Sequence, residues 1–244
     1  MPIQAIEPKR LYRQIADQLR ALIRSGEYAV GTRLPAERDL ATQLGVSRPS
    51  VREALIALEV EGLVEVRMGS GIHVMAREPA ASARELAPNA FGPFEIIRAR
   101  QLVEGELAAQ AAQRMGPAQV AGLREALAQF AQDMASGTVP VRGDRLFHLR
   151  IAEGADNGPL LRVVTDLFDE RYNPLFEQFG QHFEHHASWR LALAEHQAVL
   201  DAIAAGNADG ARTAMREHLQ RSHDRFADGW PQGATAAAPA TAST

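Results

Sequence analysis

The sequence of 244 residues contains no cysteine, so it can form neither a disulfide bond nor a thiolate metal site. It also has no apolar run that approaches the ~20 residues of a membrane-spanning helix. The N-terminal segment, MPIQAIEPKRLYRQ, lacks the apolar core of a signal peptide. Lysine is nearly absent, since every basic residue except Lys9 is an arginine. Because the sequence shows neither a signal peptide nor a membrane-spanning run, we expect a cytoplasmic protein.

The composition is otherwise that of a soluble globular protein, with 46% hydrophobic and 23% charged residues, and it excludes general disorder. The length fits one large domain or two of ordinary size. Of 26 basic and 30 acidic residues, the segment 1–77 holds 11 and 9. The formal net charge is therefore +2 for the segment 1–77 and −6 for the rest of the chain. This asymmetry of charge indicates that the N-terminal segment contacts phosphates and that the rest of the chain has a different role.

The stretch 35–58, PAERDLATQLGVSRPSVREALIAL, contains two short helical patterns separated by Gly45-Val46-Ser47. Ser47 is placed to cap the second helix, because its hydroxyl can accept a free backbone N–H of the first turn. Arg48 and Arg52 then lie four residues apart on one face, where like charges repel unless an anion lies between or beside them. The pattern predicts a helix-turn-helix whose second helix enters the DNA major groove.

The segments on either side extend this prediction. An apolar stripe predicts a helix over 11–25, and two β-like runs at 63–67 and 72–75 are joined by Met68-Gly-Ser-Gly, a hairpin signal. Three helices followed by a small hairpin make a winged helix. The glycines at the wing tip would let its backbone approach a phosphate or the minor groove.

The segment from Leu11 to Val74, including LPAERDLATQLGVSRPSVREAL and EGLVEVRMGSGIHV, resembles the DNA-binding domain of the GntR family of bacterial transcription regulators. It is also similar to the hexuronate regulators of that family. Where one branch of the family has a base-reading histidine, this chain has Met68. The resemblance implies operator contacts from Arg38, Ser47, Arg48, Ser50, Arg52 and Gly69.

The rest of the chain is predicted to be helical. We expect a winged helix-turn-helix domain at 1–75, a linker rich in alanine and proline at 76–92, an all-α bundle at 93–228 and a disordered tail at 229–244. The fold class is therefore mainly α. Within the bundle the pattern at 172–187 favours a bent helix followed by a loop. Helices are predicted at 95–115, 117–136, 142–155, 159–171, 189–206 and 208–227.

Three helices of this bundle carry candidate metal ligands. Asp144 and His148 lie four residues apart on one face, and His196 and His218 are each flanked by apolar positions that indicate an inward orientation. Such a set suits zinc, nickel, manganese or iron. The alternative is that each histidine is an ordinary core or surface residue. The D-x-x-x-H, E-H and H-L segments also resemble the metal site of the FCD-type effector domain in the FadR-like branch, which implies the same four ligands.

The first helix of the bundle carries Arg100 and Glu104, which match an R-x-x-x-E pattern of that effector domain. Either the two form an i,i+4 salt bridge, or the Arg100 guanidinium binds the carboxylate of an effector. By the same resemblance, Arg150 and Asn157 are further candidates for the effector pocket.

The leading hypothesis is a homodimeric transcription factor, a repressor, that binds a palindromic operator and responds to a small organic acid held by a metal ion and an arginine. A sugar acid is the first choice of effector. One alternative is a metalloenzyme with an attached DNA-binding domain. Against it, no general acid or base is evident, because Glu195 and Glu217, next to ligands, are expected to point away. Another alternative is a regulator whose metal is structural or is itself the signal.

Overall fold

The computed structural model describes residues 9–79, 84, 86–87, 90–228 and 230. The chain divides into two compact units, which are described separately below: the first comprises 1–90 with 230–244, and the second comprises 91–229. The predicted tail at 229–244 lies outside the described residues, except for Trp230. No helix in the described part of the chain is long and apolar enough to cross a membrane.

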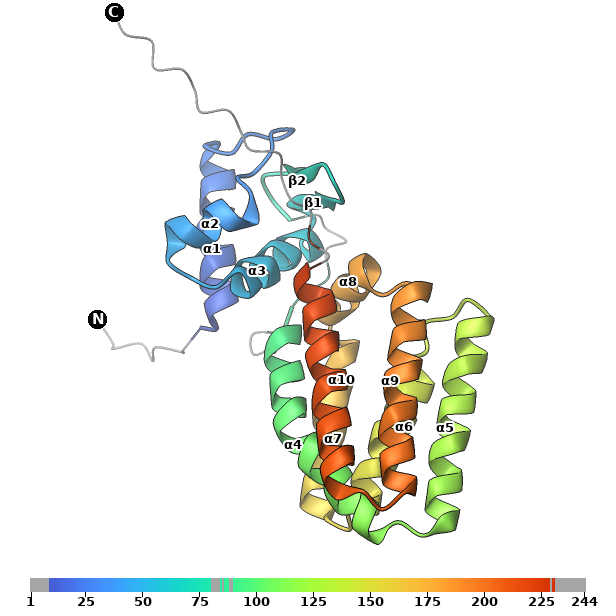
Figure 1. The fold of residues 1–244 in the computed structure, drawn as a ribbon. Coiled ribbons are helices and arrows are strands. Elements are labelled where there is room, and N and C mark those ends of the chain that lie inside the picture. Colours follow the sequence, from blue (N-terminus) through green and yellow to red (C-terminus); the bar gives the residue numbers. More distant parts are fainter. Residues whose placement is uncertain (1–8, 80–83, 85, 88–89, 229, 231–244) are drawn as a thin grey trace, which may run out of the picture. The chain divides into compact units, whose positions relative to one another are not determined.

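The first unit is the predicted winged helix. Helices α1 (Leu11–Ser25), α2 (Glu37–Leu44) and α3 (Arg48–Val60) are followed by an antiparallel hairpin of β1 (Val64–Arg67) and β2 (Gly71–Val74) (Figure 1). In the hairpin, Val64 pairs with Val74 and Arg67 with Gly71. The predicted helix-turn-helix and wing are confirmed.

Local signals in the sequence explain these element boundaries. The Ser47 hydroxyl accepts the backbone N–H of Ser50 at the start of α3, as predicted. Gly45 ends α2 with a left-handed φ of 65°, a conformation that glycine adopts without steric cost. Ile15 and Leu19 of α1 and Leu55 of α3 are buried together in the core. The apolar stripes read from the sequence therefore form the core between these helices.

Part of the predicted linker belongs to the first unit instead of running free. The side chains of Leu86 and Ala90 are buried. The Tyr12 hydroxyl donates to the carbonyl of Ala90 at 2.9 Å, and the Arg13 guanidinium donates to the carbonyl of Leu86 at 3.1 Å. Apolar burial and these two donors on α1 hold the described end of the segment against that helix.

The second unit is all-α in its described residues, as predicted. The segment 172–187, for which a bent helix followed by a loop was expected, contains the end of a short 3₁₀ turn, helix α8 and the start of α9. The elements are α4 (Pro93–Arg114), α5 (Pro117–Ala135), α6 (Val141–Gly154), α7 (Gly158–Asp169), η1 (Glu170–Tyr172), α8 (Pro174–Phe183), α9 (His186–Ala204) and α10 (Ala208–Asp228).

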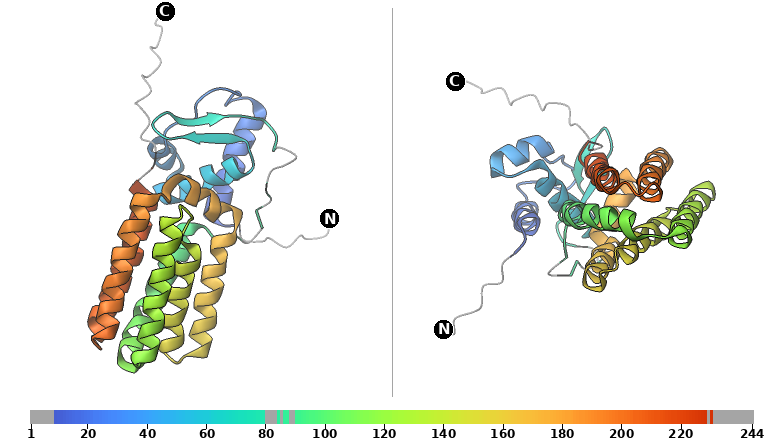
Figure 2. Two further views of the ribbon diagram at one scale, coloured as in Figure 1. Left: turned by 90° about the vertical axis from the view of Figure 1, so that its right-hand side faces the viewer. Right: turned by 60° about the horizontal axis from the view of Figure 1, so that its bottom comes forward.

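The long helices of the second unit lie roughly along one another (Figure 1, Figure 2). Helix α10 packs on α4 and α9, and α5 packs on α6 and α9. The contact of α6 with α5 is close at Gly143, where a Cβ atom would overlap the backbone of Phe130. Because Asp144 is the next residue, this close approach fixes the first predicted metal ligand in the bundle.

Candidate functional site

The predicted DNA-contacting residues lie on α2, α3 and the wing. Arg38, Ser47 and Arg48 are exposed, and Ser50 is half-buried. The Ser47 and Ser50 hydroxyls are 2.9 Å apart. Gly69 lies in the exposed turn between β1 and β2 with a φ of 76°, which leaves the backbone there unobstructed by a side chain.

The Arg52 side chain is buried, which differs from the predicted contact with DNA. Its guanidinium binds the Glu37 carboxylate at 2.8 Å, and the two side chains are 1% and 2% exposed. The same carboxylate accepts a hydrogen bond from Nε of Arg48 at 2.7 Å, although the Arg48 side chain remains 50% exposed. The Glu37 carboxylate therefore supplies the negative charge that offsets the repulsion between these two arginines. Arg48, not Arg52, presents charge to solvent.

The second unit brings Asp144, His148, His196 and His218 together from α6, α9 and α10. One ligand atom from each residue lies within 4.8 Å of the others. Nε2 of His196 is 3.1 Å from Nε2 of His148 and 3.3 Å from Oδ1 of Asp144. The three imidazoles are buried. Residues that are far apart in the sequence thus place three nitrogen donors and one oxygen donor around a common point.

Two buried carboxylates lie behind the histidines. Nδ1 of His148 hydrogen-bonds to Oε2 of Glu104, and Nδ1 of His218 hydrogen-bonds to Oε2 of Glu195 at 2.9 Å. Since an ionised carboxylate can only accept, the Nδ1 atoms are the donors, and in a neutral imidazole the Nε2 atom then carries the lone pair. Carboxylates in this position commonly orient metal-bound histidines.

The expectation that Glu195 points away from the site was wrong. Its carboxylate is buried against His218, whereas Glu217 is exposed and pairs with Arg221. Helical spacing identifies the face of a residue, but Glu195 reaches His218 on a different helix. No signal within the sequence of α9 could have revealed this contact.

The electrostatics favour the protonation states that bind a metal. Burial lowers the pKa of His218, and burial together with the neighbouring His218 and His148 holds the pKa of His196 well below its usual value. Burial opposes ionisation of Asp144 and Glu104. Nevertheless, Arg171 and His148 hold the pKa of Asp144 below its usual value, and Arg100 and His148 lower the pKa of Glu104 to about 2. These shifts favour neutral imidazoles at His196 and His218 and ionised carboxylates at Asp144 and Glu104.

The donor set fits a divalent ion. The facing Nε2 lone pairs of His148 and His196 would repel one another unless a proton or a cation lay between them. Nδ1 of His196 is buried and has no partner in the described part of the chain, so the proton of this imidazole can reside there and leave Nε2 free. Three nitrogens and one carboxylate oxygen suit zinc and other transition metals, as the sequence predicted.

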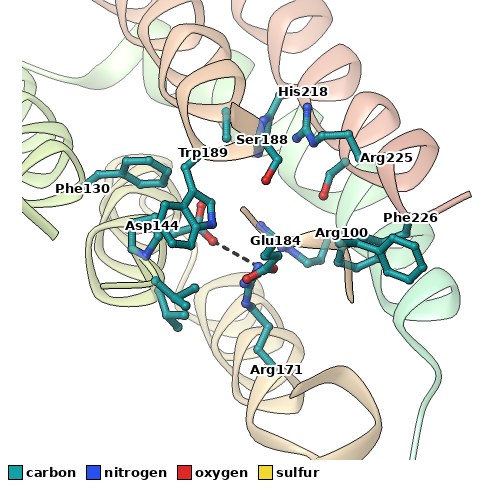
Figure 3. Close-up of a pocket in the computed structure, with 16 residues that line it drawn as sticks. Arg100, Phe130, Asp144, Arg171, Glu184, Ser188, Trp189, His218, Arg225 and Phe226 are labelled. Atoms are coloured by element: carbon teal, nitrogen blue, oxygen red, sulfur yellow. Dashed lines mark hydrogen bonds and ion pairs between the residues drawn. The ribbon is translucent and has the colours of Figure 1, made fainter. Parts of the chain in front are cut away.

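A pocket opens beside this cluster (Figure 3). It contains about 540 Å³ of space not occupied by protein atoms, a volume that includes open solvent at its mouth, and Asp144 and His218 form part of its wall. The guanidinium groups of Arg100, Arg171 and Arg225 also line it. The pocket wall thus combines two of the predicted metal ligands with three guanidinium groups and the carboxylate of Glu184.

Each of these arginines also contacts a carboxylate. Arg100 binds Glu104 at 2.6 Å and lies 3.9 Å from the centre of the Phe168 ring. Both interpretations of Arg100 are therefore compatible with its position, since it forms the i,i+4 salt bridge and also lines the pocket. Sequence reasoning missed Arg171, which contacts Asp144 at 3.5 Å and Glu184 at 2.7 Å. It also missed Arg225, which binds Glu195 at 2.8 Å.

The structure does not bring Arg150 and Asn157 to this pocket. The Arg150 guanidinium donates to the carbonyl of Gly122 on α5 and contacts Glu125 at 3.3 Å. The Asn157 side chain caps α7 by accepting the backbone N–H of Leu160. Both side chains thus fulfil structural roles at other positions of the bundle.

A winged helix followed by an all-helical domain with a pocket defines the class of this protein, a DNA-binding transcription regulator. Two family descriptions match the chain accordingly, "Bacterial regulatory proteins, gntR family" over residues 11–74 and "FCD domain" over residues 95–221.

Similar proteins support the same conclusion. The "Exu regulon transcriptional regulator" of Escherichia coli K12 is 35% identical over 229 residues, covering 90% of this chain and 86% of its own. The "Uxu operon regulator" of Haemophilus influenzae is 35% identical over 216 residues, covering 86% and 80%. The structure of E. coli McbR/YncC shares the fold, with a TM-score of 0.50 and 24% identity over 89% of this chain and 97% of the other. The chain belongs to the gntR family of bacterial transcription regulators and carries an FCD domain, and these relatives are transcription regulators.

Proposed function

We propose that this regulator is a homodimeric repressor whose operator affinity is controlled by a small carboxylate effector bound beside a divalent metal ion. Asp144, His148, His196 and His218 would hold the ion. The observation that supports the proposal most directly is the pocket itself, because Asp144 and His218 belong both to the ligand cluster and to the pocket wall.

The chemistry of the pocket favours an acid. A divalent ion with four protein ligands can accept a carboxylate oxygen at a remaining coordination position. Arg100, Arg171 and Arg225 supply guanidinium groups that suit the same anion. A sugar acid is the first choice, because the front of the sequence resembles the hexuronate regulators.

Control of DNA binding requires that the effector bind one arrangement of the dimer better than another. Helix-turn-helix dimers bind two half-sites related by a two-fold axis, so a change in the spacing of the two winged helices would change operator affinity. In this scheme Arg38, Ser47, Arg48, Ser50 and Gly69 would contact the operator, and Arg52 would act through Glu37.

A screen of uronates, aldonates and simple organic acids against the purified protein, with zinc, nickel or manganese present, tests the proposal. We expect at least one sugar acid to raise the melting temperature and to release operator DNA. A screen in which no acid shifted the melting temperature of the metal-loaded protein would contradict the proposal.

The variant His196→Ala distinguishes the proposal from the remaining alternative, in which the ion is purely structural or is itself the signal. If the acid acts through the ion, this variant should fold and bind operator but no longer release it when the acid is added. A variant that still releases operator normally would show that the ion does not anchor the effector.

A further inference from the structure

The indole of Trp189 presents an unused hydrogen-bond donor to the pocket. Its Nε1 atom is buried and has no partner in the part of the chain that the structure describes. Trp189 lines the pocket with Asp144, and Figure 3 shows its ring directed toward the pocket interior. Because buried indole N–H groups are nearly always hydrogen-bonded, this exception requires an explanation.

The position of Trp189 is fixed by the start of α9. The backbone N–H of Ser188 donates to Nδ1 of His185 at 3.2 Å, and the backbone N–H of His185 donates to the Ser188 hydroxyl at 2.9 Å. This capping box sets the entry of the chain into the helix immediately before Trp189. The backbone that carries the indole is therefore held by hydrogen bonds.

The other strong donors of the pocket already have partners. Glu104, Glu184 and Glu195 accept hydrogen bonds from Arg100, Arg171 and Arg225 respectively. Further binding by these guanidinium groups favours an anion, because they are charged. The Trp189 N–H is neutral and can only donate, so it suits a neutral oxygen acceptor such as a hydroxyl or an ether.

We propose that Trp189 is a specificity-determining residue, whose Nε1–H donates a hydrogen bond to a hydroxyl or ring oxygen of the effector while the carboxylate of the effector lies toward the arginines and the metal ligands. The site therefore selects hydroxylated acids over plain carboxylic acids. A site with a buried donor discriminates against analogues that lack the acceptor, because the donor is then left unpaired. This inference rests on the proposed function.

The test compares D-galacturonate with cyclohexanecarboxylate, which has a six-membered ring and a carboxylate but no hydroxyl. Trp189→Phe removes the N–H and retains an aromatic ring, and Trp230→Phe is the matched control, since the chain has only two tryptophans. Binding of both acids and of zinc is measured by calorimetry. We expect Trp189→Phe to weaken galacturonate binding by about three- to tenfold and to leave cyclohexanecarboxylate and zinc binding unchanged.

Fluorescence gives a second readout. In Trp230→Phe the remaining indole is Trp189, and we expect its emission to change when galacturonate is added to the zinc-loaded protein. Unchanged galacturonate affinity in Trp189→Phe, or equal weakening of both acids, would overturn the assignment of a donor role. Failure of every sugar acid to bind the wild-type protein would overturn the proposed function itself, which is a distinct result.

Discussion

Nδ1 of His218 on α10 lies 2.9 Å from Oε2 of Glu195 on α9, within the buried interior of the second unit. The residue next to Glu195 is the candidate ligand His196, so one short segment supplies both a candidate ligand and a carboxylate that hydrogen-bonds to another. Arg225 binds the same carboxylate at 2.8 Å and borders the pocket. The candidate metal ligand His218 and Arg225 of the pocket wall thus contact one shared carboxylate.

Glu195→Ala should reduce affinity for zinc by about 10–100-fold, the usual effect of losing a carboxylate that orients a histidine ligand. The measurement is competition with a chromogenic chelator. Glu217→Ala is the matched control, because Glu217 is next to a ligand in sequence but exposed. Equal zinc affinity in the wild type and Glu195→Ala would contradict the orienting role.

Removal of the metal should destabilise the second unit. Because an ion that binds only the folded state stabilises it by mass action, about 2.7 kcal/mol is gained at a free ion concentration one hundred times Kd. Dialysis against a chelator should therefore lower the melting temperature of the wild type, and added zinc should restore it. His196→Ala should show no such response. If neither the chelator nor added zinc changed the melting temperature of the wild type, this result would argue against a metal site.

Glu37→Ala should destabilise the winged helix strongly, by roughly 3–5 kcal/mol, because it leaves the buried Arg52 without its carboxylate. Urea unfolding followed by circular dichroism measures the change. Glu65→Ala is the control, since Glu65 and Arg67 form an exposed pair and should contribute little. A Glu37→Ala protein as stable as the wild type would show that the pair with Arg52 is dispensable.

Arg48→Ala should weaken operator binding by about 1–3 kcal/mol if Arg48 makes a bidentate contact with a base. The fold should survive, because Glu37 keeps its contact with Arg52. Fluorescence anisotropy with DNA selected by the wild-type protein from a random pool measures the loss. Arg52→Ala should instead lower the melting temperature. The reverse result for the two variants would show that their roles are exchanged.

Gly143→Ala should disturb the set of four candidate metal ligands by shifting the backbone next to Asp144. A methyl group there would overlap the backbone of Phe130 on α5, and overpacking of this kind costs about 1–3 kcal/mol. We expect lower stability together with weaker zinc binding, since Asp144 moves with α6. In the control Gly154→Ala, the atoms nearest to the new methyl group belong to the flexible side chain of Met115 and not to backbone. Equal effects of the two substitutions would contradict the argument.

The sequence determined the winged helix almost completely, because its signals are local. Ser47 caps α3 through the backbone N–H of Ser50, three residues away, and Gly45 ends α2 through its own φ. The hairpin follows from two short runs around a glycine turn. The set of Asp144, His148, His196 and His218 was also predictable, since helical spacing and apolar flanks indicate the buried face of each helix.

Only the tertiary structure decided which groups surround those residues. Glu37 was an ordinary helix residue in the sequence, yet it lies between Arg48 and Arg52 and buries the second of them. Three side chains reach one pocket from η1, α9 and α10, namely Arg171, Trp189 and Arg225, whereas Arg150 and Asn157 do not reach it. The physical reason is that periodicity fixes the face of a residue on its own helix, while a site depends on how separate helices pack against one another.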